Sequence, residues 1–234
     1  MRQTEYSGRD NLEVMQEAIN YNKFLLDLIL LSAEKNDLLV DFGAGNGAFS
    51  FPLSAIGYRV ICVETDPVLS IEIAKHGLTV LNDLEQVEDE SISYLYSLNV
   101  LEHIENDSEI MALWYRKLRP GGKMIVYVPA FQILFSSMDR KVGHVRRYSK
   151  VELCRKLCHA GFEITESRYA DSIGFIATLI YKWIGRKDGA IDPKMLKIYD
   201  HWIFPFSRLL DVITYRAWGK NVYARAVKPA NTNQ

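Results

Sequence analysis

Apolar and polar positions follow two alternating patterns along most of this 234-residue chain. Short apolar runs, typical of buried strands, are followed by longer segments in which apolar residues recur every three or four positions, as on one face of a helix. We expect strands at 38–40, 58–63, 78–81, 91–98, 123–128 and 162–169. We expect helices at 48–56, at 110–118, at 149–160 and after Pro67. This alternation predicts an α/β fold with a doubly wound, mostly parallel sheet and helices on both faces.

The two ends of the chain have a different pattern. Helical spacing predicts one leading helix over 11–33, and the alternating run 221–227 predicts a seventh, edge-like strand. The Arg-Pro-Gly-Gly stretch 119–122 is expected to end a helix before the fifth strand begins. Aromatic-rich helical segments predict a helical insertion between strands six and seven. We expect a single domain over 1–234, divided into a helical lead (1–35), a core (36–170), an insertion or cap (171–219) and a last strand with a tail (220–234).

Composition narrows the possible functions. The 28 basic and 29 acidic residues give a net charge of -1, which argues against a general nucleic-acid surface. The chain has only three cysteines, and this small, odd number does not fit a disulfide framework. A reducing, cytoplasmic location is therefore expected. The polar N-terminus lacks the apolar core of a signal peptide, and no apolar run reaches the roughly 20 residues that span a bilayer.

The segment VDFGAGNGAFS (40–50) places three glycines directly after the first expected strand. In an α/β sheet this turn lies at the carboxyl ends of the strands, where ligands bind, and glycine lets a ligand approach the backbone closely. A nucleotide-like cofactor is therefore expected. NAD is one alternative, because Gly43, Gly45 and Ala48 satisfy the dinucleotide pattern and Glu64 follows about 20 residues later. Asp41 favours S-adenosylmethionine instead, because a carboxylate repels a pyrophosphate and attracts an amino group and a nearby positive charge.

Five ordered motifs extend this second interpretation: VDFGAGNGAFS, VICVETDP, LNDLE, YSLNVLEHIEND and LRPGGKMIVYVP. With them, the chain resembles a class I S-adenosylmethionine-dependent methyltransferase from residue 21 to about residue 170. The resemblance implies a Rossmann-like methyltransferase fold with S-adenosylmethionine as cofactor. It also implies a cofactor site formed by Tyr21, Asp41, Gly43, Gly45, Gly47, Glu64, Thr65, Asp83, Leu84 and Asn99.

The resemblance gives these residues separate roles. The glycines would contact the methionine and ribose portion, with Asp41 near the amino group. Glu64 would hold both ribose hydroxyls, and Asp83 would accept a hydrogen bond from the adenine amino group, beside Leu84. Asn99 would line the pocket, and Tyr21 would close over the methionine end. Structural alternatives stay open, since Asp83 could simply start a turn and Asn99 could simply end a strand.

Two histidines are candidate catalytic bases. His103 and His144 belong to the one side-chain type whose ordinary pKa lies near neutrality, and a hydroxyl acceptor must lose a proton. Glu102 and His103 also resemble an acid-histidine pair that binds a divalent metal in some small-molecule and RNA methyltransferases. Those sites use a further carboxylate where this chain has Asn99, a poorer ligand for a hard cation. No metal is therefore expected, although His144 could complete a site.

The segment MDRKVGHVRRYS (138–149) is the most distinctive part of the chain. Arg146, Arg147 and Tyr148 are candidate substrate-binding residues, because paired arginines favour planar anions such as phosphate or carboxylate. The alternative is a loop whose arginines bind carbonyls or neighbouring acids. The stretch resembles a bacterial methyltransferase subgroup with a GHxRRY loop, associated with glycan- or lipid-linked substrates. The aromatic residues of 172–218 are expected in the core or a homodimer contact, with a lid over an apolar acceptor or a peripheral membrane contact as alternatives.

Three functions follow from these patterns. The first is methyl transfer to an O or N nucleophile of a small or lipid- or glycan-linked acceptor. The second is an NAD-dependent oxidoreductase, which Asp41 and the later motifs disfavour. The third is a catalytically silent protein that binds S-adenosylmethionine.

Overall fold

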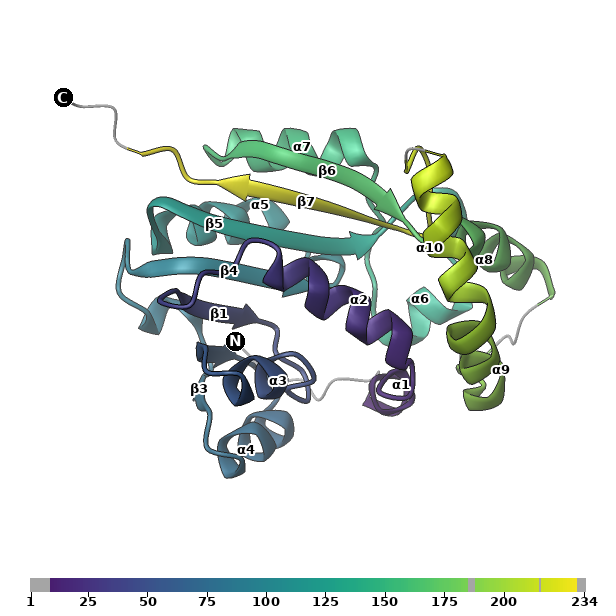
Figure 1. Ribbon diagram of the computed structural model, residues 1–234, viewed down its shortest axis with the longest axis horizontal. Helices are drawn as coiled ribbons and strands as arrows, with labels where there is room; N and C mark the ends of the chain where they lie inside the picture. The colour runs from purple at the N-terminus through teal and green to yellow at the C-terminus, as the bar shows by residue number, and fades with distance from the viewer. Residues whose placement is uncertain (1–8, 185–187, 215, 231–234) are drawn as a thin grey trace.

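A seven-stranded sheet forms the centre of the molecule, as the computed structural model of residues 9–184, 188–214 and 216–230 shows (Figure 1). The strands lie in the order β3-β2-β1-β4-β5-β7-β6. Only β7 runs antiparallel to its neighbours among these strands, so the other six end at one edge of the sheet. The strands are β1 (Leu38–Phe42), β2 (Arg59–Val63), β3 (Thr79–Leu81), β4 (Ile92–Leu98), β5 (Leu118–Pro129), β6 (Glu163–Ala170) and β7 (Asn221–Val227). The expected α/β class and strand order along the chain are confirmed.

Helices cover both faces of this sheet. In Figure 1, α5 and α7 lie behind it and α2 crosses in front. The rear core contains Trp114 and Leu153, whereas the front core contains Leu25, Leu53 and Tyr94, all fully or almost fully buried. The helices up to β6 are α1 (Arg9–Met15), α2 (Ile19–Leu30), α3 (Ser50–Ala55), α4 (Pro67–Lys75), α5 (Asp107–Lys117), α6 (Ser137–Val142) and α7 (Lys150–His159), with 3₁₀ turns η1 (Leu84–Gln86), η2 (Leu101–His103) and η3 (Gln132–Leu134).

The leading helix expected over 11–33 is two helices, α1 and α2, which corrects the sequence prediction. The reason is a long-range cap. The carboxylate of Asp200 accepts hydrogen bonds from the amides of Asn20 and Tyr21, both at 2.9 Å, so a new helix N-terminus can form there. Apolar spacing continues across the break, so the sequence pattern could not reveal it.

Two predictions about strands were also wrong. Segment 119–122 does not end a helix before β5, because β5 already begins at Leu118 and the register shifts between the pairs Ile92–Leu118 and Tyr94–Lys123. The Gly pair therefore forms an irregularity within the strand. β7 is not an edge strand, since it lies between β5 and β6. Its alternating pattern arises because Val222 faces the rear core while Tyr223 faces the front one.

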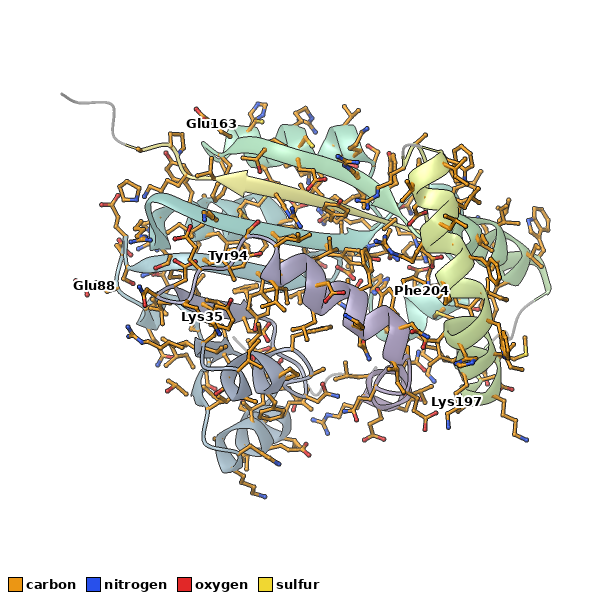
Figure 2. All side chains as sticks on the ribbon, viewed as in Figure 1. Lys35, Glu88, Tyr94, Glu163, Lys197 and Phe204 are labelled. Carbon is orange, nitrogen blue, oxygen red and sulfur yellow. The ribbon has the colours of Figure 1, made fainter. Side chains whose placement is uncertain are left out.

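The expected insertion between β6 and β7 is present and lies beyond the carboxyl edge of the sheet, at the right of Figure 1. It consists of α8 (Ser172–Ile184), α9 (Pro193–Ile198), the π-helical turn η4 (Tyr199–Ile203) and α10 (Phe204–Ile213). Figure 2 labels Phe204 where α10 meets α2, and its ring packs against Tyr21 and Phe24. Along the described ranges, none of the helices has the length and apolarity needed to cross a membrane.

Candidate active site

The glycine-rich turn after β1 is built for close approach. Gly43 and Gly47 have φ values of 81° and 77°, a conformation that side-chain-bearing residues rarely adopt. A Cβ at Gly43 would overlap the side chain of Val100, and one at Gly47 would lie 2.6 Å from Phe51. The turn therefore packs closely against the segment after β4 and against α3.

Glu64 directly follows β2 beside this turn and bridges two backbone segments. Its Oε2 accepts from the amide of Gly45 at 2.7 Å, and its Oε1 accepts from the amide of Asp66 at 2.8 Å. Burial raises the pKa of Glu64, while the two amide bonds oppose that rise. Each carboxylate oxygen has a second lone pair, so Glu64 can accept two further hydroxyl hydrogens. Thr65 follows it and is exposed.

Asp41 lies beneath the glycine turn and is only 3% exposed. Its Oδ2 accepts a 2.6 Å hydrogen bond from the hydroxyl of Ser50, the first residue of α3. Burial raises the pKa of Asp41 to about 7, against the lowering effect of bonds from Ser50 and Tyr96. A cation bound above the turn would favour the ionised form of this carboxyl.

The other cofactor candidates occupy the same edge of the sheet. Asp83 is exposed and accepts from the amide of Glu85 at 3.0 Å, so it does start a turn, and Leu84 is buried in the core. Asn99 directly follows β4 and has a φ of 55°, and its Nδ2 lies 3.5 Å from the hydroxyl of Tyr21. The structure thus brings Asn99 and Tyr21 together, although they are 78 residues apart.

A buried acid and two histidines gather after β4. Glu102 is fully buried, and both its carboxylate oxygens lack a hydrogen-bond partner. Its Oε1 lies 3.6 Å from Nε2 of His144, whose ring packs edge-on against that of His103 with 4.6 Å between centroids. Burial raises the pKa of Glu102 to about 7 and lowers that of His103 to about 4. The two candidate bases are therefore neighbours.

Asp139 fixes the orientation of His144, a role that sequence reasoning missed. Its Oδ1 lies 2.7 Å from Nδ1 of His144, and its carboxylate also accepts bonds of 2.8 and 2.9 Å from Arg147. Burial alone would raise the pKa of Asp139, but these contacts outweigh it and hold the pKa well below its ordinary value. A capping box between Ser136 and Asp139 begins α6, and the sequence pattern S-x-x-D was the available signal.

The GHxRRY residues contact the protein itself. Arg147 is 6% exposed and pairs with Asp139, as described above. Arg146 pairs with Asp107 at 2.9 Å and donates to the carbonyl of Glu105, while the hydroxyl of Tyr148 donates to Asp107 at 2.8 Å. This loop is therefore fastened to the segment between β4 and α5, which keeps His144 next to Glu102.

These features agree with the comparisons with known proteins. A family model described as a methyltransferase domain matches residues 15–167, more than half of the chain. The chain belongs to this methyltransferase-domain family. The expected resemblance to class I S-adenosylmethionine-dependent methyltransferases and the expected Rossmann-like fold are confirmed.

Individual relatives are distant. A Mycolicibacterium smegmatis protein, described as a probable S-adenosylmethionine-dependent methyltransferase, is 26% identical over 140 residues, which are 55% of this chain and 53% of that protein. The chain thus spans about half the length of this curated relative. A second match is a chain from a Haloferax volcanii complex between the Trm112 methyltransferase activator and a protein assigned as a methyltransferase. The TM-score is 0.67 and the identity is 15%, and the match covers 97% of this chain and 96% of that chain. Haemonchus contortus phosphoethanolamine N-methyltransferase 2, solved with S-adenosyl-L-methionine, matches with a TM-score of 0.60, 19% identity and coverage of 90% and 52%.

Proposed function

We propose that this protein transfers the methyl group of S-adenosylmethionine to an O or N nucleophile of a small, lipid- or glycan-linked acceptor. The observation that carries the proposal is the arrangement of the glycine turn and Glu64 at the carboxyl edge of the sheet. Membership of the methyltransferase-domain family supports it. The NAD alternative has less support, because the family model that matches the chain is a methyltransferase domain.

The residues at this edge fit the cofactor. Glu64 would accept the ribose hydroxyls, and the glycine turn would hold the ribose and methionine portion. Asp83 and Leu84 would contact the adenine ring. Asn99 and Tyr21, already in contact, would cover the methionine end. Asp41 would act on the amino group and the sulfonium from below, as a buried charge rather than through a direct bond.

When bound, S-adenosylmethionine supplies an electrophilic methyl group. The protein must then align an acceptor with that group and remove a proton if the acceptor is a hydroxyl. We assign this second task to His103 and His144. Burial keeps His103 neutral at pH 7, and Asp139 holds His144 so that its Nε2 faces inward toward Glu102. Arg146, whose side chain is 25% exposed, is the member of the RRY triplet best placed to meet an anionic acceptor.

The insertion supports a lipid-linked acceptor. Helices α9 to α10 form one continuous helical run in which large apolar side chains recur at helical spacing, each more than half exposed. This apolar stripe consists of Met195, Ile198, Trp202, Phe206, Leu209 and Ile213. Part of the aromatic insertion is thus neither core nor covered by the described residues of this chain.

The charges around the apolar stripe favour an anionic bilayer surface over a second copy of the chain. Both acids of the run 193–213, Asp200 and Asp211, are buried, whereas Lys194 and His201 are exposed. Lys197 is also exposed and pairs with Glu17 at 3.0 Å, and the exposed acid Asp192 caps α9. Beside α10, a cavity of about 410 Å³ is lined by four arginines, one of them Arg208 of α10, and by one lysine, against the two acids Asp27 and Glu166. A second copy would bring the same basic surface against this one, while anionic headgroups would attract it.

A transfer assay with methyl-labelled S-adenosylmethionine tests the proposed function. The purified protein is incubated with a bacterial lipid extract and, separately, with an aqueous metabolite extract. We expect labelled product in the lipid fraction. Label in the aqueous fraction alone would contradict a lipid-linked acceptor, and binding of S-adenosylhomocysteine without label transfer in either would favour the silent protein. Binding of NADH in place of S-adenosylhomocysteine would favour the oxidoreductase.

A further inference from the structure

The carboxyl group of Glu102 is buried without a hydrogen bond to stabilise its charge. It is fully buried, and neither oxygen has a hydrogen-bond partner. Buried carboxylates in folded proteins are normally hydrogen-bonded, paired with a cation or bound to a metal, because desolvation without compensation is costly. Arg147 lies nearby, but its guanidinium donates to Asp139 and to the carbonyl of Ala130. No hydrogen-bond donor among the described residues therefore reaches the Glu102 carboxylate, and His144 Nε2, at 3.6 Å from its Oε1, is too far to make that bond.

The neighbours of Glu102 are metal-binding side chains. One atom each from Glu102, His103 and His144 lies within 4.8 Å of the other two. The separation of Glu102 Oε1 and His144 Nε2 is 3.6 Å, too long for a hydrogen bond. Two ligands that each lie about 2.1 Å from one tetrahedral ion are separated by about 3.4 Å. The spacing is therefore close to that of two ligands sharing an ion.

The surroundings orient these side chains as they are oriented in metal sites. A metal-bound histidine usually gives its second ring nitrogen to a carboxylate or a carbonyl, which fixes the ring. Asp139 provides this carboxylate at Nδ1 of His144, and Arg147 in turn holds Asp139.

We propose that Glu102, His103 and His144 bind one divalent transition-metal ion. Two imidazole nitrogens and one carboxylate oxygen suit zinc, manganese, iron or cobalt better than magnesium or calcium, which prefer oxygen ligands. The sequence argument against a metal depended on Asn99 standing where a further carboxylate would be. In the folded chain His144 takes the place of that carboxylate as the third ligand. It lies 41 positions after His103, in the loop that Arg146, Arg147 and Tyr148 hold in place.

Three protein ligands leave at least one coordination position open. With the ion present, the two histidines would act on the acceptor through the metal, which would lower the pKa of a bound hydroxyl. This catalytic use depends on the proposed methyl transfer, whereas binding of the ion does not. Metal binding and cofactor binding can therefore fail separately.

Titration of the full chain with Co²⁺ and Zn²⁺ tests the site. After treatment with a chelator, the protein is titrated by calorimetry, and Co²⁺ binding is followed by its visible absorption. We expect one ion per chain, and at least a tenfold loss of affinity in Glu102→Gln and in His144→Gln. The matched control is His159→Gln, an exposed histidine on α7 that is expected to bind as the wild type does.

Folding and cofactor binding are checked in the same samples. Each variant is tested for S-adenosylhomocysteine binding, which the two ligand substitutions should reduce by less than threefold. If Glu102→Gln fails to fold, His144→Gln, at a side chain 15% exposed, carries the test. Absence of a one-to-one Co²⁺ complex, or equal affinity in the wild type and a folded ligand variant, would overturn the proposal. Loss of the complex in His159→Gln would assign it to surface binding and would overturn it as well.

Discussion

Asp200, in the insertion, holds the N-terminus of the helix that carries Tyr21. Its Oδ1 accepts the amide of Tyr21 at 2.9 Å across 179 residues of sequence, and its Oδ2 accepts the amide of Asn20. The insertion therefore positions the tyrosine that contacts Asn99 at the cofactor edge. A substitution in the insertion should therefore change the affinity for the cofactor.

Asp200→Ala is expected to lower the free energy of unfolding by about 1–2 kcal/mol, the usual cost of removing a helix N-cap. It should also weaken S-adenosylhomocysteine binding severalfold, because Tyr21 loses its support. Asp192→Ala is the control, since Asp192 caps the exposed helix α9 and contacts neither Tyr21 nor Asn20 through the bonds described. Denaturant unfolding and calorimetry measure both quantities. Equal cofactor affinity in the two variants would contradict the idea that Asp200 supports the cofactor site through Tyr21.

Asp41 should make stability depend on pH. Its folded pKa of about 7 lies above the unfolded value of about 3.9, so its contribution is fully present below the unfolded pKa and is lost as the pH rises through 7. Between pH 5.5 and pH 8.5 the expected loss is roughly 2 kcal/mol. Asp41→Asn should reduce the decrease by this amount. Urea unfolding of both proteins at the two pH values measures it, and parallel decreases would contradict the assignment.

The two arginines of the RRY triplet should differ sharply. Arg147→Ala leaves Asp139 buried without its main cation, and removing one partner of a buried ion pair typically costs about 3–5 kcal/mol. Arg146→Ala removes a partly exposed contact with Asp107, which Lys156 also neutralises, so a loss of about 1 kcal/mol or less is expected. Chemical denaturation gives both values. Similar stability in the two variants would contradict a structural role for Arg147.

The apolar stripe should control membrane affinity. Replacing both Trp202 and Leu209 with serine removes two exposed apolar side chains, and binding to vesicles containing phosphatidylglycerol should fall at least tenfold. Ile71→Ser, at an exposed apolar residue on α4, is the control. Vesicle cosedimentation measures binding, and sedimentation velocity measures oligomeric state. Unchanged vesicle binding together with a dimer that the double substitution dissociates would assign the stripe to a homodimer instead.

The sequence predicted features that depend on local pattern. Strand β5 carries the continuous apolar run 124–128 because both of its faces are covered, and the glycines at 43–47 mark a turn whose backbone angles exclude most other residues. The positions of Glu64, Asp83 and Asn99 at strand ends follow from the rule that parallel strands end at one edge. Their binding roles are still predictions.

Long-range partners could not be predicted from the same patterns. Nothing in the spacing of 11–33 indicates that Asp200 would divide it into two helices. The pairing of Asp139 with Arg147 and His144 depends on a loop that folds back on α6, so the arginines looked available for a substrate. The gathering of Glu102, His103 and His144 is likewise a product of tertiary structure.

Calorimetry with S-adenosylhomocysteine tests the central claim most directly, namely that the glycine turn and Glu64 bind the adenosine cofactor. The wild type should bind one molecule per chain, and Glu64→Ala should bind at least tenfold more weakly, since hydrogen bonds to a charged group contribute about 1.5–3 kcal/mol. Glu72→Ala, at an exposed glutamate on α4, should match the wild type. No heat with the wild type, or equal affinity in a folded Glu64→Ala, would contradict the account.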